Sequence, residues 1–139
     1  MKYKHFKQAL LFKVGSIMEI YKEWLRSNGF RFEETPIGLM FKYQGGNFIV
    51  ANNNGDKNYF QLLFPCIDKV NDTQKVKALE ALNTINRELK CIKGTLTEDN
   101  EVWLTTEIFV DHTPNVEDFF LRLLDILMTG RVKYSNLMA

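Results

Sequence analysis

The sequence predicts an α+β fold, in which an antiparallel sheet of about five to six strands carries three main helices in the order α-β-β-β(-β)-α-β-β-α. Two observations predict it. Apolar residues recur every three or four positions over 16–28, 72–90 and 114–130, as in amphipathic helices. Between these stretches apolar and polar residues alternate, as in strands, and the turns are short, as in an antiparallel meander.

The chain has 139 residues, which suits one domain, expected over 16–130. A basic N-terminal segment, 1–15, precedes this domain and a C-terminal tail, 131–139, follows it. The segment combines lysines with an apolar side, formed by Lys2, Lys4, Lys7, Lys13, Tyr3, Phe6, Leu10 and Leu11. The segment can be a surface for a membrane or an anionic partner. Four lysines over this length are a weak signal for such binding, so a first helix or a mobile arm packed on the domain is favoured.

The first helix is expected to begin at Ser16, which has capping-box spacing to Glu19, and to end at Asn28-Gly29. Its apolar face is formed by Ile17, Ile20, Tyr21, Trp24 and Leu25. Alternation then predicts strands over 30–35, 37–43, 48–51 and 59–64. They are separated by Pro36, by a tight turn at Gly45-Gly46 and by a polar loop, and the last ends at Pro65.

The central helix, 72–90, carries an apolar stripe that we expect to be buried, formed by Val76, Leu79, Leu82, Ile85 and Leu89. Asn71 or Asp72 can cap it, and Gln74 lies three residues after Asn71, as in a capping box. For the last helix, Thr113 can cap, Pro114 suits the first helical position and Gly130 can end it. The side chains expected to point inward are Val116, Phe119, Phe120, Leu123, Leu124 and Leu127.

The strand after the acidic turn 98–101, running from Val102 to Val110, is apolar on both faces. Leu104 and Ile108 point one way, whereas Trp103 and Phe109 point the other. Burying one such side chain is worth roughly 1.5 to 3 kcal/mol, so we expect neither face to stay in water. Either helices cover both faces of the sheet, or a second copy of the chain covers one.

No catalytic, cofactor or metal site emerges from the residue pattern. Phosphate-binding loops, HExxH and CxxC are missing, and Asp111-His112 has no accompanying nucleophile motif. The acidic turn at 98–101 and the NNNGD loop at 52–56 are better explained as solvated turns than as cation sites. Cys66 and Cys91 are expected to be buried thiols in a reducing compartment.

The overall charge argues against nucleic acid and membrane partners. Eighteen basic residues nearly balance seventeen acidic ones, which gives no field that would attract a polyanion. No apolar run approaches the roughly 18 to 20 residues needed to span a bilayer, and none near the N-terminus is long enough for a secretory signal. The cytoplasm is therefore the expected location.

The second half of the chain resembles the YbjN-like group, whose fold is similar to that of type III secretion chaperones. The resemblance rests on Leu82-Asn-Thr-Ile-Asn86, Gly94, the turn Asp99-Asn100, the strand Val102 to Val110 and the segment Thr113 to Leu124. It implies a bacterial-type α+β domain, usually a homodimer, that binds another protein or influences regulation and has no active site. The first and last helices would then cover one face of the sheet, and the central helix with a symmetry mate the other.

The leading hypothesis is therefore a non-enzymatic, chaperone-like or regulatory homodimer, with Trp103, Phe109, Asn83 and Asn86 as candidate interface residues and no cofactor. Asn83 and Asn86 could instead hydrogen-bond the strand that follows their helix. A rival hypothesis is a small-molecule binder or enzyme with a pocket between helices and sheet, and Asp111 and His112 at its rim. A third is an adaptor that uses Lys2 to Lys13.

Overall fold

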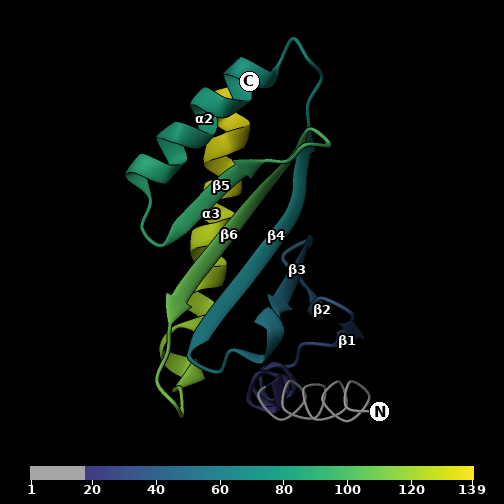
Figure 1. Cartoon of the computed structure of the whole chain (residues 1–139), viewed down its shortest axis with the longest axis vertical. Helices are drawn as coiled ribbons and strands as arrows, with labels where there is room; N and C mark the ends of the chain where they lie inside the picture. Colours follow the sequence, from purple (N-terminus) through teal and green to yellow (C-terminus); the bar gives the residue numbers. More distant parts are fainter. Residues whose placement is uncertain (1–17) are drawn as a thin grey trace, which may run out of the picture.

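The computed structural model describes residues 18–139, and its element order is the predicted one. A helix over 18–27 comes first. It is followed by β1 (Phe32–Thr35), β2 (Gly38–Tyr43), β3 (Gly46–Ala51), β4 (Tyr59–Lys69), α2 (Lys75–Glu88), β5 (Ile92–Leu96), β6 (Glu101–Phe109) and α3 (Phe120–Met138) (Figure 1). Short 3-10 turns lie at Asn53–Gly55 and Val116–Asp118. The expectations for 1–15, Ser16 and Ile17 lie outside the described residues.

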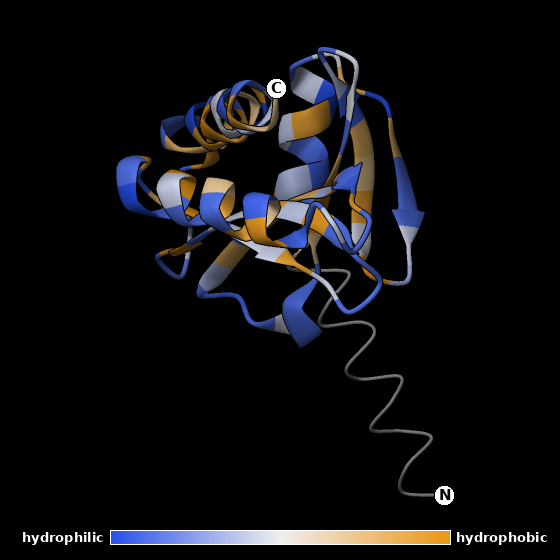
Figure 2. Cartoon of the chain, turned by 90° about the horizontal axis from the view of Figure 1, so that it is seen from above, coloured by the Kyte–Doolittle hydropathy of each residue, from blue (hydrophilic) through white to orange (hydrophobic). Residues whose placement is uncertain are grey.

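The six strands form one antiparallel sheet in the order β1-β2-β3-β4-β6-β5, which confirms the predicted fold class. The helices gather on one side of it, as the view from above shows (Figure 2). α3 runs behind β5 and β6 with α2 alongside (Figure 1). The two helices are in contact, because Lys77 Nζ of α2 donates to the backbone carbonyl of Met138 in α3, 3.0 Å away. The sheet therefore has one covered face and one open face.

The core lies between the covered face and the helices. Trp24 of the first helix stacks on Phe120 of α3 with ring centroids 4.0 Å apart, and Tyr21 contacts Phe60 of β4 at 5.0 Å. Tyr21, Trp24 and Leu25 are buried, as their helical spacing predicted. The strands supply the other wall with alternate residues, the largest being Phe41, Phe48, Phe60, Leu62, Val102 and Leu104.

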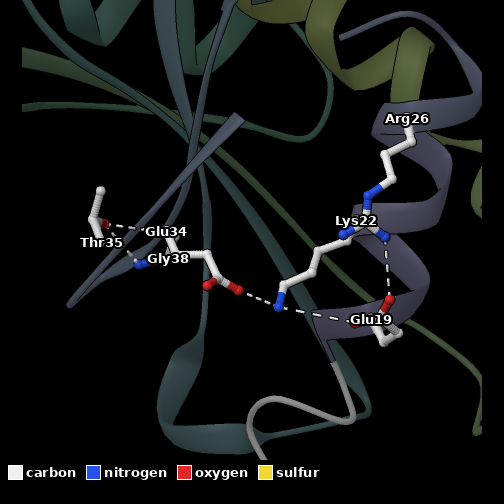
Figure 3. Close-up of polar contacts among 6 residues, drawn as sticks. All are labelled: Glu19, Lys22, Arg26, Glu34, Thr35 and Gly38. Atoms are coloured by element: carbon white, nitrogen blue, oxygen red, sulfur yellow. Dashed lines mark hydrogen bonds and ion pairs between the residues drawn. The ribbon is translucent and has the colours of Figure 1, made fainter. Parts of the chain in front are cut away.

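A cluster of charged side chains ties β1 to the first helix (Figure 3). Lys22 pairs with Glu34 of β1 and lies 3.9 Å from Glu19, which in turn accepts a hydrogen bond from Arg26 at 3.2 Å. The hydrogen bond and charge of Lys22 lower the pKa of Glu34. The guanidinium of Arg26 also lies over the Phe32 ring, 5.3 Å from its centroid. β1 is thus held against the helix from one side.

The turn from β1 to β2 requires glycine at position 38. Its φ is +152°, and a Cβ there would meet the Val50 carbonyl oxygen at 1.9 Å. Thr35 fixes the same turn, because its hydroxyl donates to the Gly38 carbonyl at 2.8 Å and accepts from the Gly38 N–H at 3.2 Å (Figure 3). The two-residue turn Pro36-Ile37 therefore sets the register of the hairpin.

The predicted reciprocal hydrogen bonds between Asn71 and Gln74 are present, but they close the turn before the central helix, and α2 begins at Lys75, not at Asp72. The Gln74 N–H donates to Asn71 Oδ1 at 3.1 Å, and the Asn71 N–H donates to Gln74 Oε1 at the same distance. The predicted apolar stripe is only partly correct. Leu82 and Ile85 are buried, whereas Val76 and Leu79 are 67% and 51% exposed, because small residues, Ala78 and Ala81, complete the buried face instead.

Two predicted strand boundaries are wrong. β4 does not end at Pro65 but continues to Lys69 through a bulge, where the register shifts between Phe64 and Asp68 and Cys66 adopts a φ of 46°. A bulge leaves a residue without its ladder partner, which is why a proline fits there. The turn placed at Gly45-Gly46 is formed instead by Gln44 and Gly45, both with positive φ, and Gly46 opens β3.

The last helix is longer than predicted. α3 passes through Gly130 and includes most of the segment expected as a tail, where Tyr134 is buried and donates to Asp68 Oδ2 at 2.7 Å. Gly130 serves close packing, because a Cβ there would meet the Ile92 Cδ1 atom at 2.7 Å. The start is also displaced: Thr113 and Pro114 precede the turn at Val116–Asp118, and α3 begins at Phe120.

Candidate functional site

The open face of the sheet is the candidate functional site. Strand pairing aligns one row of side chains across it, namely Met40, Ile49, Leu63, Thr105 and Lys93 from β2, β3, β4, β6 and β5. No helix of the described part of the chain packs on these side chains, because alternate residues of the same strands, such as Leu62 and Leu104, face the helices. Ile49 is nevertheless buried, since neighbours in the row shield it. The centre of the open face is therefore apolar.

A polar network lies beside this row and centres on Glu107 of β6. Its carboxylate accepts a hydrogen bond from the Tyr59 hydroxyl and a longer one, 3.5 Å, from Gln61 Nε2. Lys93 Nζ of β5 lies 2.5 Å from Glu107 Oε1. The hydrogen bonds from Lys93 and Tyr59 lower the pKa of Glu107, whereas desolvation and then Glu107 raise the pKa of Tyr59 to about 12. The carboxylate is therefore ionised and engaged at neutral pH, which makes it a structural anchor.

Aromatic side chains stand on either side of this network. Phe109, at the end of β6, is 88% exposed, and its ring centroid lies 6.1 Å from that of Tyr59. Trp103 is half-buried, and its indole N–H donates to Glu101 Oε2 at 3.0 Å. Sequence reasoning thus put both rings on the correct face of the strand. The expectation that neither face stays in water allowed for cover by a second copy. Within one subunit Phe109 is exposed, because it lies where the strand ends and only Tyr59 is beside it.

The expectation that the central helix lies on the second face of the sheet is wrong. α2 packs on the same face as α3, because Gly94 of β5 lies under Leu82 of α2, where a Cβ would meet Leu82 Cδ2 at 2.7 Å. The central helix therefore adds nothing to the open face. Within residues 18–139, no helix covers that face.

The two candidate asparagines lie on α2, away from Trp103 and Phe109. Asn86 hydrogen-bonds the following strand, as expected: its Oδ1 accepts from the Gly94 N–H at 2.6 Å and its Nδ2 donates to the Gly94 carbonyl at 3.2 Å. Asn83 is exposed. Sequence reasoning missed the exposed side chains of Val76 and Leu79, which share the outer side of α2 with Asn83.

The remaining sequence candidates do not assemble into a reactive site. Cys66 and Cys91 are free and exposed, not buried as predicted, because each has a positive φ outside the regular strand pattern. Desolvation, with Glu101 adding to it, raises the pKa of the Cys66 thiol. Asp111 and His112 are exposed beside a hollow of about 230 Å³. His5 lies outside the described residues.

Two further properties bear on the kind of site. Among residues 18–139, no group of three or more His, Cys, Asp or Glu side chains is placed so that it could hold a metal ion. In the same part of the chain, no helix is both long enough and apolar enough to cross a bilayer.

Comparison with known proteins places the chain in a family. Residues 19–123 match the model of the YbjN family, described as a putative bacterial sensory transduction regulator. The solved structure of YbjN, a putative transcription regulator from E. coli, is similar with a TM-score of 0.65 at 15% identity, over 84% of this chain and 87% of that one. An uncharacterized protein from Methanothermobacter thermautotrophicus has a TM-score of 0.62 at 13% identity, over 88% of this chain and 96% of that one.

At these identities the two structures show the fold alone, and no curated protein matches the sequence. The family model, in contrast, spans most of the chain, from the first helix to α3. The chain therefore belongs to the YbjN family.

Proposed function

We propose that this chain is a non-enzymatic regulatory protein of the cytoplasm that acts by binding polypeptides, and that it forms a homodimer through the open face of the sheet. The observation that carries the proposal is the open face itself, on which an apolar row and two aromatic rings lie and which no element of residues 18–139 covers. An exposed ring such as Phe109 beside an uncovered apolar row favours a protein interface. The family's description as a regulator supports a binding role.

A second copy of the chain suits this face because a two-fold interface must be complementary to itself. Lys93 and Glu107 place one positive and one negative charge side by side near its centre. Trp103 and Phe109 lie on the same strand to either side of Thr105 and Glu107. A two-fold axis near Thr105 would set Phe109 of one copy against Trp103 of the other and remove the exposed ring from water.

The test is sedimentation velocity over a range of protein concentrations. The wild-type chain of 16.3 kDa should sediment as a dimer. Phe109→Glu should sediment as a monomer, because it places a charge where the Phe109 ring would pack on the second copy. Phe109 is so exposed that the substitution should leave the subunit folded, which a circular dichroism spectrum checks.

The matched control is Val76→Glu, which introduces the same charge at an exposed apolar residue of α2. It should leave the dimer intact. A wild-type protein that stays monomeric at every concentration would contradict the proposal. Dissociation by Val76→Glu together with a persistent Phe109→Glu dimer would assign the interface to α2 and remove the open face from it.

A further inference from the structure

The open face also carries a cleft of about 540 Å³ at its other end, where β1, β2 and β3 meet, away from the proposed dimer contact on β6. It is lined by Gly29, Phe30, Arg31, Phe32, Glu33, Met40, Phe41, Lys42 and Asn47. A volume of this size is typical of small-molecule sites. β4 separates it from β6 in the sheet, so the side chains of the proposed dimer contact, Trp103 and Phe109, do not line it.

The pairing of the strands brings two cations together in this cleft. Phe32 is opposite Phe41 in the β1–β2 ladder, so continuing the register by one residue places Arg31 opposite Lys42. Lys42 is in turn opposite Asn47 of β3. Side chains directly opposite on neighbouring strands lie within contact range, and like charges there repel. The three side chains form a row of hydrogen-bond donors across three strands.

Neither cation has an acidic partner within the part of the chain that the structure describes. Ion pairs there involve Lys22, Arg26, Lys75, Lys93 and Lys133. Glu33 also lines the cleft but lies opposite Met40 and reaches neither Arg31 nor Lys42 within ion-pair distance. Two repelling cations beside an amide are a site at which an anion would be stabilised.

The walls of the cleft are held in place before any ligand binds. Lys22 pairs with Glu34 and Arg26 covers Phe32 from the helix side (Figure 3), so β1 is fixed on the side away from the cleft. Phe30 contacts Phe41 and Tyr43 with ring centroids 5.6 and 5.9 Å apart. Half-buried Met40 provides an apolar part of the lining. A site that is already formed loses little binding free energy to ordering.

We propose that this cleft binds a small organic anion, a carboxylate or a phosphate ester, whose charged group lies between Arg31 and Lys42 and whose apolar part lies on Met40. Asn47 donates a further hydrogen bond to the anion. Glu33 disfavours a second negative charge at the other end of the ligand. The site therefore selects for one anionic group attached to an apolar body.

The experiment is a titration of the full chain followed by backbone amide signals in two-dimensional NMR. The probes are sodium hexanoate, hexyl phosphate, inorganic phosphate and hexanol. Hexanoate or hexyl phosphate should move the amide signals of Arg31, Lys42 and Asn47, and whichever binds more tightly identifies the anionic group. Hexanol should not bind, because it lacks the charge. Inorganic phosphate should bind more weakly than hexyl phosphate, because it lacks the apolar body.

The decisive variant carries Arg31→Gln and Lys42→Gln, and its affinity for the better probe should fall at least about tenfold, the loss expected for a charged hydrogen bond. The control carries Lys69→Gln and Arg122→Gln, two exposed cations outside the cleft, and should keep full affinity. Equal loss in both double variants, equal binding of hexanol, or no shift with any probe would overturn the proposal. Phe109→Glu should bind the probe normally, which separates this site from the dimer contact.

Discussion

The two faces of β6 differ although their amino-acid compositions are similar. On the covered face Val102, Leu104 and Thr106 are completely buried, whereas on the open face Phe109 is 88% exposed and Glu107 holds a polar network. The sequence predicts that both faces are apolar, yet all the described helices that pack on the sheet lie on one side. A strand with two apolar faces therefore need not have both faces covered by helices of the same subunit. One face stabilises the fold, and the other stays accessible.

The largest effect is expected from truncating the covered face. Leu104→Ala should lower the free energy of unfolding by about 3 kcal/mol, because it leaves a cavity among Leu82, Ile92 and the helices. Phe109→Ala on the open face should change it by less than about 0.5 kcal/mol at low protein concentration. Urea unfolding of both variants measures the contrast. Equal losses would show that the open face is covered within a single subunit.

Breaking the contact between α2 and β5 should cost somewhat less. Asn86→Ala should lower the free energy of unfolding by about 2 kcal/mol, because it leaves the N–H and carbonyl of buried Gly94 without their partner. Asn83→Ala, at an exposed position of the same helix, is the control and should be nearly neutral. Thermal unfolding monitored by circular dichroism distinguishes them, and comparable destabilisation by both would argue that helix propensity, not the Gly94 contact, is responsible.

Removing a hydroxyl from the covered face should stabilise the protein. Thr106 is completely buried, and its Oγ1 has no hydrogen-bond partner among the described residues. Thr106→Val keeps the shape and removes that unsatisfied group, which should raise the free energy of unfolding by about 1 kcal/mol. Thr105→Val, the same change on the open face, should have the smaller effect. A destabilised Thr106→Val variant, by urea unfolding, would mean that the hydroxyl is satisfied in solution.

The smallest expected effect is the pH dependence of stability that Glu107 on the open face contributes. The Glu107 pKa is lowered from 4.5 by hydrogen bonds from Lys93 and Tyr59 and by the charge of Lys93. In the window below 4.5 the unfolded chain therefore binds more protons than the folded one, so this contribution is complete above that pH and is lost as pH falls through the folded-state pKa. Glu107→Gln should be less stable than wild type at neutral pH, and the gap in melting temperature should narrow on acidification. If the difference in melting temperature widened on acidification, the ionised form of Glu107 would not be the stabilising one.

Local signals explain which parts of the fold could be predicted. The reciprocal hydrogen bonds of Asn71 and Gln74, the helix end at Gly29 and the buried positions Leu82 and Ile85 depend on residues close in sequence. The sequence could not show which side of α2 meets the sheet, because α3 and β5 decide it, so Val76 and Leu79 were misplaced. The role of Gly130 could not be predicted for the same reason, because the approach of Ile92 to α3 is a contact between distant segments.

In the candidate sites, too, local features could be predicted from the sequence and features that depend on packing could not. Trp103 and Phe109 were put on the correct face because alternation along a strand is local, but their exposure depends on where the helices dock. The pairing of Arg31 with Lys42 was missed, although a two-residue turn at Pro36-Ile37 fixes it by counting outward from the turn. The register of this hairpin is a local signal for the two neighbouring cations, whereas the cleft around them depends on the packing of distant segments.

The side-chain amide of Asn86 affects how the edge strand β5 can pair with strands of neighbouring molecules. An antiparallel sheet offers unpaired backbone groups at its two outermost strands, and these invite further strands from neighbouring molecules. On β5 the side chain of Asn86 occupies the amide and carbonyl of Gly94, so the ladder is closed at its midpoint by the protein itself. While Asn86 holds Gly94, an incoming strand cannot pair with that residue, which disfavours growth of the sheet into a continuous ribbon through β5.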